Sequence, residues 1–324
     1  MQRHSLPVKK IACALFVLWA LVSFPCSARA EKAVSGVPLK LALLPILDVF
    51  PFYVAQKEGY FDEAGIHVRA VPVASGLERD QLMQSEEIDG MLTEMTTTAT
   101  FNQRQPLVKI VRVARVAYPD YPLFRLLAAP GSGLHSPKQL SGVPIAVSKN
   151  TIIEYVTDRL LAAHGLGQGE IITRSVPVIP ERYHLLMQGQ IKAAMLPDPL
   201  AASALKAGAL LVTDDSTHPD LSTSVLSFST RTLEDRGDMV RRFLKAWDRA
   251  ASKINAGPDV YRELLMERIR VPENIEETYV IPPYPRNGVP SREQWEDVIA
   301  WMTAKGLLKA LLPYEGSVTE VYLR

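Results

Sequence analysis

The chain has 324 residues, with 36 Lys and Arg against 35 Asp and Glu, and a formal net charge of +1. This balance, without a basic stripe or a run of like charges, argues against a nucleic-acid partner, because such binding depends on clustered cations. Nearly three hundred residues remain after a predicted export signal. That length is enough for two compact lobes, each with its own core.

Residues 1–30 have the composition of an N-terminal export signal. The segment begins with the positive residues Arg3, Lys9 and Lys10. An apolar run from Ile11 to Val22 follows, and then a small-x-small cleavage site, Ala28-Arg29-Ala30. The apolar run is shorter than the roughly 20 residues that span a bilayer. We therefore predict a periplasmic protein whose signal is cleaved after Ala30. The alternative is a lipid anchor at Cys26, although the residues before it lack the small side chain expected there.

Both cysteines of the chain, Cys13 and Cys26, lie in this predicted signal. A mature protein without them has no disulfide, no thiol nucleophile and no cysteine ligand for a metal. The histidines are scattered, and neither a G-x-S-x-G nor a G-x-G-x-x-G motif is present. The sequence therefore predicts no enzyme, no metal site and no cofactor.

A β-α-β-α order runs through the first part of the mature chain. Apolar or alternating runs predict strands, and segments bounded by Pro, Gly or Thr predict helices between them. The expected strands are 39–44, 66–71, 88–93 and 108–116, and the expected helices are 51–56, 77–86 and one that begins at 96–98. This order is typical of a mostly parallel sheet with helices on both faces.

The same order returns after a predicted crossing strand at 126–129. The expected strands are 144–147, 171–178, 191–196 and 209–212, and the expected helices are 136–140, 151–163, 181–189 and 199–207. The run 224–228 then leads back to the first lobe. We predict an α/β fold in which lobe I comprises 31–126 and 228–324, and lobe II comprises 127–227. Two crossing strands would form the hinge between them.

The C-terminal part is predicted to be helical. Apolar residues recur at helical spacing from Val240 to Ile254, which favours a long helix with one buried face. Ser291-Arg292-Glu293-Gln294 is a capping box that begins a further helix. We interpret the apolar stripe as core rather than as a binding groove.

One stretch of thirteen residues has a second copy. Residues 82–94 align without a gap with residues 186–198, and the copies end on Glu94 and Asp198. Each copy has the pattern of a helix end, a turn and a strand that carries an acid at its end. We interpret this as one supersecondary unit used in both lobes, and chance similarity is the alternative.

Four segments carry a resemblance to a known family. They are 51–68, which contains Lys57-Glu58-Gly59-Tyr60-Phe61, and then 140–147, 186–194 and 243–258. In this order they resemble the periplasmic solute-binding proteins of ABC importers for nitrate, alkanesulfonates, taurine and thiamine-precursor pyrimidines, the SsuA/THI5-like family. Lys192 departs from the pattern, since the family usually has aspartate there. The likeness covers nearly the whole mature chain and does not fix the ligand.

The resemblance implies a two-lobed periplasmic-binding-protein fold of type II that closes on a small ligand. It also implies transient docking on the permease of an ABC importer, and we expect a monomer. A ligand-sensing module for a membrane kinase is an alternative on the same fold. Enzymes on this fold, such as chorismate dehydratase and the yeast-type pyrimidine synthase, are a further alternative. The export signal argues against both enzymes, and the absence of a cysteine-rich motif argues against the second.

Ligands of open α/β sheets bind beyond the carboxyl ends of the strands. Helix starts offer free N–H groups there, and strand ends in this chain carry acids and aromatic side chains. The candidate ligand-binding residues are Asp48, Phe52, Ser75, Glu94, Thr96, Thr97, Tyr121, Asn150, Thr151, Tyr155 and Asp198. The acids have helix capping or ion pairs with Lys or Arg as alternatives, and the alternative for Phe52 and Tyr155 is core packing.

The acids decide which ligand we expect. At an effective dielectric constant of 20, opposite charges about 4 Å apart attract by roughly 4 kcal/mol before desolvation, and like charges repel as strongly. Unpaired carboxylates would therefore reject an anion, and we predict a ligand with amine or amidine-like donors, such as a pyrimidine or another vitamin precursor. Arg115 and Arg125 keep a taurine-like or amino-acid-like zwitterion open. Binding of a sulfonate or nitrate is the alternative.

Overall fold

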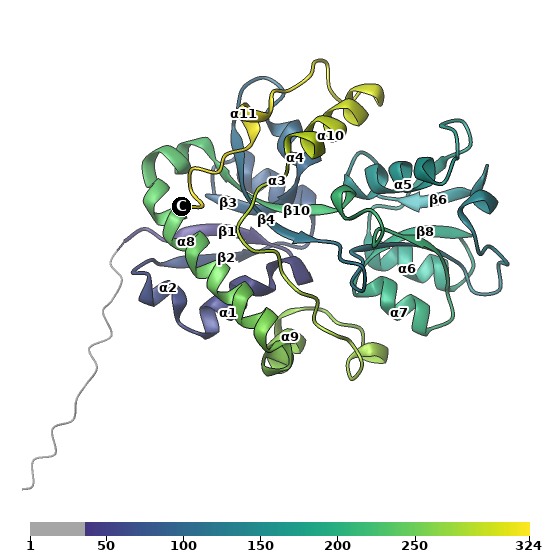
Figure 1. Cartoon of the computed structure of the whole chain (residues 1–324), viewed down its shortest axis with the longest axis horizontal. Helices are drawn as coiled ribbons and strands as arrows, with labels where there is room; N and C mark the ends of the chain where they lie inside the picture. The colour runs from purple at the N-terminus through teal and green to yellow at the C-terminus, as the bar shows by residue number, and fades with distance from the viewer. Residues whose placement is uncertain (1–35) are drawn as a thin grey trace, which may run out of the picture. The chain divides into compact units, whose positions relative to one another are not determined.

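The computed structural model describes residues 36–324, so the predicted export signal, its cleavage site and Cys26 lie outside the described residues. Two five-stranded sheets organise this part of the chain (Figure 1). The strand order is β2-β1-β3-β10-β4 in the first sheet and β7-β6-β8-β5-β9 in the second. We call the elements around the first sheet the first lobe and those around the second sheet the second lobe.

The strands repeat one arrangement in both sheets. The first sheet contains β1 (Leu39–Leu43), β2 (Val68–Pro72), β3 (Gly90–Glu94), β4 (Val108–Val116) and β10 (Thr223–Ser229). The second contains β5 (Phe124–Ala128), β6 (Pro144–Val147), β7 (Ile172–Ser175), β8 (Ala193–Pro197) and β9 (Leu210–Asp214). In each sheet three strands pair in parallel, and the crossing strand, β10 or β5, pairs antiparallel with both of its neighbours.

The sheets are therefore mixed, whereas the sequence predicted mostly parallel pairing. The difference arises at the crossing strands, because each of them enters its sheet from the other lobe and runs against its neighbours. The chain passes between the sheets at 117–123 and again at 215–222. The predicted lobe limits at 126/127 and 227/228 fall inside β5 and β10, and the division into lobes stays a prediction.

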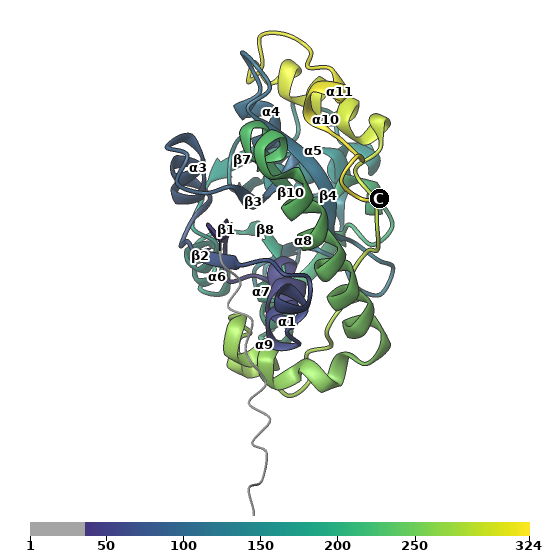
Figure 2. The same cartoon turned by 90° about the vertical axis from the view of Figure 1, so that its left-hand side faces the viewer.

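Helices cover both faces of the first sheet. They are α1 (Phe50–Lys57), α2 (Tyr60–Glu63), α3 (Gly76–Gln84), α4 (Met95–Phe101) and α8 (Thr230–Ala256), with the 3-10 turn η1 (Leu47–Val49) before α1. Because side chains alternate along a strand, Leu41 of β1 packs in one cluster with α1 and α8, whereas Ala42 packs with Met83 of α3. Figure 2 shows α8 passing along this sheet with α1 beside it.

The second sheet follows the same rule. Its helices are α5 (Ile152–Ala163), α6 (Ile179–Met187) and α7 (Leu200–Lys206), and the short turn η2 (Pro137–Leu140) precedes β6. Ile145 of β6 packs in one cluster with α5, and its neighbour Ala146 packs in another with α6 and α7. The buried apolar faces thus hold three layers together, which is the α/β architecture expected from the sequence.

The remaining elements are η3 (Pro219–Leu221), η4 (Pro258–Tyr261), α9 (Arg262–Arg268), η5 (Glu273–Ile275), α10 (Arg292–Ala304) and α11 (Tyr314–Ser317). The predicted capping box of α10 is confirmed, since Ser291 accepts from the Gln294 N–H and Gln294 accepts from the Ser291 N–H. The long helix is also confirmed, with a non-helical residue at Arg236. Helix α9 was not predicted.

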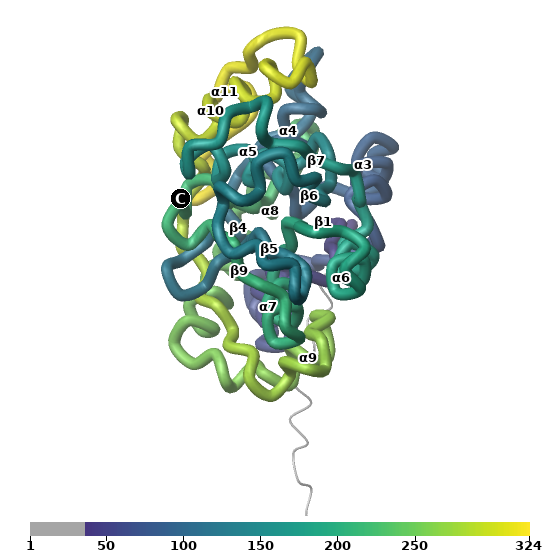
Figure 3. The backbone as a smooth tube through the Cα atoms, turned by 90° about the vertical axis from the view of Figure 1, so that its right-hand side faces the viewer, coloured from purple at the N-terminus to yellow at the C-terminus, as the bar shows by residue number. Residues whose placement is uncertain are grey.

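Helix α10 contacts both lobes. Its apolar residues belong to one cluster with α4 of the first lobe and α5 of the second (Figures 1 and 3). Trp301 Nε1 donates to Asp158 Oδ2 at 2.8 Å, and Arg159 Nη2 donates to Asp297 Oδ1 at 2.7 Å. Elsewhere, Asn274 of η5 exchanges two hydrogen bonds with Ser203 of α7, at 2.7 and 3.1 Å.

Most expected strands and helices lie within about two residues of their predicted place, and β7 is the clearest exception. The sequence predicted a strand over 171–178, but pairing ends at Ser175. Pro177 lacks an N–H to continue a ladder. The carbonyl oxygens of Val176 and Pro177 instead accept hydrogen bonds from the side chains of Arg182 and Ser148.

Candidate functional site

Polar side chains form a row across the rim of the first sheet. In the strand register, Ser224 of β10 lies opposite Glu94 at the end of β3 and opposite Arg115 near the end of β4. Residues directly opposite each other on neighbouring strands present their side chains to the same face. The register therefore brings a carboxylate, a hydroxyl and a guanidinium together where β3 and β4 end.

Arg115 lies at the β4 end of this row, with only 1 % of its surface exposed. Its Nη1 lies 3.5 Å from Asp48 Oδ2. Burial lowers the pKa of Arg115, but Asp48, with further contributions from Tyr279, Tyr284 and Asp198, raises it above the ordinary value overall. In the described part of the chain, its Nε and Nη2 atoms have no hydrogen-bond partner. A charged, buried guanidinium therefore keeps free donors beside the ends of both sheets.

Asp48 does not cap the helix that follows it, which was one of its two predicted roles. The N-cap of α1 is Val49, and no side chain caps that helix. Asp48 is instead buried in η1, where its partner is Arg115. Tyr284 fixes the same turn, because its hydroxyl donates to the Leu47 carbonyl oxygen at 2.7 Å.

Asp198 occupies the matching place in the second lobe. Arg125 Nη1 of β5 donates to its Oδ1 atom, and the Tyr279 hydroxyl donates to Oδ2 at 3.0 Å. Burial, followed by the charge of Asp198, raises the pKa of Tyr279 well above its ordinary value, so the phenol keeps its proton. The segment that carries Tyr279 also carries Tyr284, whose hydroxyl bonds the carbonyl oxygen of Leu47 next to Asp48. We call Asp48, Arg115, Arg125, Asp198 and Tyr279 the central cluster.

Glu94 is also paired. It accepts a hydrogen bond from Thr97 Oγ1 at 2.8 Å and lies 3.6 Å from Nη2 of Arg79. It occupies the N-cap position of α4 without a side-chain capping bond. Beside it, the buried Thr96 Oγ1 has no partner among the described residues. All three predicted acids thus have an arginine neighbour, so the rims are close to neutral rather than acidic.

The start of α5 is satisfied by its own residues. Thr151 caps this helix by accepting from the Ile153 N–H at 3.2 Å, and its hydroxyl donates to the Ser148 carbonyl oxygen. Asn150, in the left-handed region at φ +63°, donates its N–H to Glu154 Oε2 at 2.7 Å. Burial raises the pKa of Glu154, but this bond and the nearby Lys305 lower it overall. Both predicted residues thus make hydrogen bonds within the segment that begins the helix.

Four other predicted residues lie outside the central cluster. Phe52 is fully buried among Tyr53 and Phe61. Tyr155 is buried as well, and its hydroxyl donates to Asp297 Oδ2 at 2.6 Å. Ser75 is an exposed cap of α3, and Tyr121 forms a backbone bridge with Tyr118. The contacts of Phe52 and Tyr155 are those of their alternative role, core packing.

The sequence did not single out Tyr279, Tyr284 or Ser224 as site residues. The two tyrosines lie in an irregular segment rich in Pro, where no periodic pattern indicates which side chain turns inward. Their spacing around Pro282 and Pro283 was the available signal, because a stiff segment holds aromatic side chains at fixed places. Ser224 becomes visible only through the pairing of β10 with both β3 and β4.

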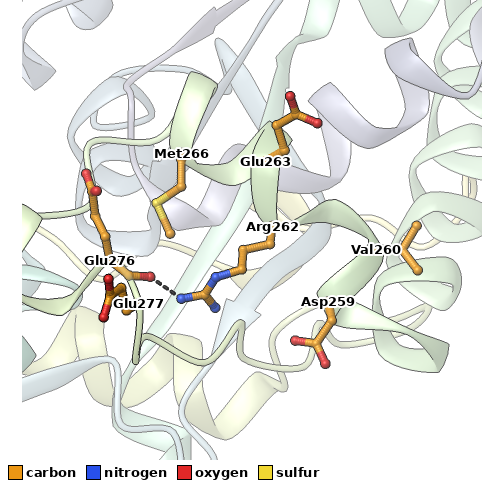
Figure 4. Close-up of a pocket in the computed structure, with 7 residues that line it drawn as sticks. All are labelled: Asp259, Val260, Arg262, Glu263, Met266, Glu276 and Glu277. Carbon is orange, nitrogen blue, oxygen red and sulfur yellow. Dashed lines mark hydrogen bonds between the residues drawn. The ribbon is translucent and has the colours of Figure 1, made fainter.

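The linings of two surface pockets contain no residue of the central cluster. One, of about 580 Å³, is lined by Asp259, Val260, Arg262, Glu263, Met266, Glu276 and Glu277 (Figure 4). Its Arg262 donates to the Glu276 and Tyr279 carbonyl oxygens. The other, of about 470 Å³, lies beside Lys40, Asp89 and Arg236. Neither contains a predicted ligand-binding residue.

Two negative findings hold for residues 36–324. Among them, no three His, Cys, Asp or Glu side chains are grouped so that they could hold a metal ion. No helix in that range is both long and apolar enough to cross a membrane.

Comparison with known proteins gives one family and a common fold. The family described as NMT1/THI5-like matches residues 47–260. A ligand-binding component of an ABC-type import system from Staphylococcus aureus is 13 % identical, with a TM-score of 0.74, and covers 89 % of this chain and 98 % of its own. The alkanesulfonate-binding protein SsuA from Xanthomonas axonopodis pv. citri, bound to MOPS, is 17 % identical with a TM-score of 0.72, covering 88 % and 99 %.

The desulfurization enzyme DszB is 14 % identical with a TM-score of 0.68, and the match covers 89 % of this chain and 98 % of the enzyme. No curated protein matches the chain. At these identities the structures show the fold alone, which is that of periplasmic binding proteins.

Proposed function

The chain belongs to the NMT1/THI5-like family, and from this premise we propose that it is an exported solute-binding protein for an ABC importer. It captures a small ligand between its lobes and delivers it to the permease, on which it docks transiently as a monomer. The fold shared with the ligand-binding component of an import system supports this role. The predicted export signal places the protein in the periplasm.

The ligand we propose carries an anionic group, such as a sulfonate or a carboxylate. The observation that carries this is Arg115, whose buried guanidinium has Nε and Nη2 free in the described structure. Buried donors of this kind favour an acceptor, and a bidentate oxyanion is the partner that suits a guanidinium best. The SsuA structure bound to MOPS, a sulfonate, supports this choice on the same fold.

The amine or pyrimidine ligand predicted from the sequence depended on unpaired acids. Asp48, Glu94 and Asp198 each have an arginine within ion-pair distance, which removes most of their repulsion of an anion. An amine on the same molecule still finds carboxylate oxygens in the central cluster. A taurine-like or amino-acid-like zwitterion therefore fits as well as a simple anion.

A thermal-shift panel on the mature protein tests this proposal. Taurine, ethanesulfonate, nitrate and acetate are compared with ethylamine and cytosine at equal ionic strength. We expect stabilisation by a sulfonate or a zwitterion, because a ligand that binds only the folded state raises the melting temperature. Stabilisation by ethylamine or cytosine alone would overturn the anionic ligand and restore the cationic one.

Variants of Arg115 assign the effect to this residue. Arg115→Lys keeps the charge but loses the bidentate fork, and we expect about tenfold weaker sulfonate binding, which corresponds to roughly 1.4 kcal/mol. Arg104→Lys is the matched control, since Arg104 is exposed in a loop and the same exchange is made there. Equal binding in Arg115→Lys and wild type would show that the ligand does not use this guanidinium.

A role in import and a role in sensing predict different neighbouring genes. Genes for a permease and an ATPase beside this one favour import, and a histidine-kinase gene favours a sensor. A catalytic role has the desulfurization enzyme as its structural neighbour. The simplest check of that alternative is whether a ligand found in the panel is recovered unchanged after incubation with the protein.

A further inference from the structure

The described residues include four arginines of which less than 5 % is exposed: Arg79, Arg112, Arg115 and Arg182. Three of them have a carboxylate within 4 Å, supplied by Asp80 and Glu94, by Asp248 and by Asp48. Arg182 has none within the described part of the chain. A buried charge without a counter-ion is strongly unfavourable, so this exception needs a physical explanation.

The contacts of Arg182 leave most of its donors free. Its Nη1 donates to Ser148 Oγ at 3.0 Å and to the Val176 carbonyl oxygen at 2.8 Å, and both acceptors are neutral. Its Nε and Nη2 have no partner in the region that the structure describes. Burial lowers the pKa of Arg182 to about 10, so the guanidinium is still charged at neutral pH.

The surroundings of Arg182 favour an anion. Helix α6 begins at Ile179, and no side chain caps it. The first N–H groups of a helix attract negative charge, and Arg182 lies in the first turn of α6, which also contains Pro180, without an N–H, and the acid Glu181. Arg182 itself is fully buried, but the residues that follow its two acceptors in the chain are exposed, namely Lys149 and Asn150 after Ser148 and Val178 after Val176. An ion would reach the guanidinium by displacing these loop residues.

The first lobe shows how such an arginine is normally neutralised. Arg79 is the fourth residue of α3, and Arg182 is the fourth residue of α6. Arg79 pairs with Glu94 at the end of β3. The equivalent acid in the second lobe, Asp198, is already bonded to Arg125 and Tyr279. Among the described residues, therefore, no acid pairs with Arg182 as Glu94 pairs with Arg79.

We propose that Arg182 and the amino-terminal end of α6 form an oxyanion-binding site. It takes sulfate or phosphate as free ions, or the sulfonate or carboxylate group of a small organic molecule. The site shares none of its named residues with the central cluster, and the proposal does not depend on the ligand assigned there. An oxyanion at Nε and Nη2 supplies both the charge and the acceptors that the chain itself does not provide.

The side-chain Nε–H signal of Arg182 in ¹⁵N NMR spectra gives a site-specific test. The signal is identified by its loss in Arg182→Met and is followed during titration with sodium sulfate, sodium methanesulfonate or sodium chloride at matched ionic strength. We expect a saturable shift with an oxyanion and none with chloride. A response to sulfate identifies free ions as ligands, and a response to methanesulfonate alone identifies an organic head group. No saturable shift with either oxyanion overturns the proposal.

Thermal unfolding supplies the second measurement. We expect sulfate to raise the melting temperature of the wild type and of the exposed control Arg104→Met, and this rise to be reduced at least severalfold in Arg182→Met. If Arg182→Met does not fold, Arg182→Lys replaces it, because it keeps the charge but offers fewer fixed donors. If the melting temperature of the Arg182 variant rises as much as that of the wild type, the guanidinium only joins the loop at Ser148 to the loop at Val176.

Discussion

We interpret helix α3 with strand β3 and helix α6 with strand β8 as two copies of one unit, and each strand is the third of its sheet. Each helix places a buried arginine at its fourth residue, and each strand end carries an acid. In the first lobe these two groups pair, as Arg79 and Glu94 do. In the second lobe Asp198 pairs with Arg125 and Tyr279, and Arg182 has no acid.

This difference teaches that similar topology does not conserve charge pairing. The acid at the strand end pairs with the helix arginine in the first lobe and with Arg125 of β5 in the second. Arg182 is then left without an acid among the described residues.

Removing an acid from the first lobe leaves a paired arginine without its acid, as Arg182 is. We expect this change to have the largest effect on the free energy of unfolding. Asp48→Asn leaves Arg115 buried with less compensation, and we expect a loss of about 3–5 kcal/mol in the free energy of unfolding. Urea unfolding measures it, with the exposed Asp62→Asn as control. A loss below about 1 kcal/mol would mean that Asp198, the other acid of the central cluster, compensates for the missing charge.

A buried acid without a basic partner among the described residues extends the comparison of ion pairs to negative charge. Asp215 is fully buried where the chain crosses between lobes, and it accepts from the Leu123 and Phe124 N–H groups at 2.9 and 3.0 Å. Burial raises its pKa from 3.8 to about 6. Because the folded state holds the proton more tightly, its contribution to stability is present below the unfolded pKa and is lost as pH rises through about 6.

This shift of roughly two pKa units corresponds to about 3 kcal/mol. The measurement is the free energy of unfolding of wild type minus that of Asp215→Asn, taken from pH 4 to pH 7. We expect this difference to fall as pH rises. A flat difference would show that Asp215 has an ordinary pKa, and a rising one would show that its carboxylate is stabilised by the two N–H groups.

Introducing an acid beside Arg182 in the second lobe should remove the difference in charge pairing between the two lobes. Ser148→Asp replaces the hydroxyl 3.0 Å from Arg182 Nη1 with a carboxylate. We expect a gain of about 2 kcal/mol in the free energy of unfolding, typical of a charged hydrogen bond, together with a loss of the sulfate response. Ser148→Asn is the control of equal shape, and an unchanged sulfate response in Ser148→Asp would contradict the site.

The smallest expected effects concern the helix caps of the two lobes. Thr151→Ala and Ser75→Ala each remove a capping bond, at 3.2 Å in both cases, and each should cost about 1 kcal/mol. Ligand affinity should stay unchanged in Thr151→Ala, because this hydroxyl already donates to the Ser148 carbonyl oxygen and accepts from the Ile153 N–H. Isothermal titration with a ligand from the panel measures this, and a tenfold loss of affinity would restore Thr151 as a ligand contact.

Local sequence patterns were sufficient for most of the fold. Proline at the start of α1, the left-handed Gly59 after it and the alternation of β4 each depend on near neighbours in the chain. The strand-end positions of Asp48, Glu94 and Asp198 followed from the same patterns. The direction of β5 and β10 did not, because it depends on which strands the crossing segments join.

The partners of the candidate acids could not be predicted in the same way. Arg125 is 73 residues from Asp198, and Tyr279 is 81 residues from it. Any arginine at a strand end was an equally good partner until the sheet order was known. The burial of Phe52 and Tyr155 likewise depends on helices α8 and α10, which come much later in the chain.

Helix α10 determines how the two lobes are able to separate. On its side they are joined by a large apolar cluster with Trp295 and Trp301, whereas near α7 the Asn274–Ser203 contact provides two hydrogen bonds, each worth about 1 kcal/mol. Breaking the contacts near α7 therefore costs less than breaking the apolar cluster around α10, so we expect any separation of the lobes to begin at the α7 side.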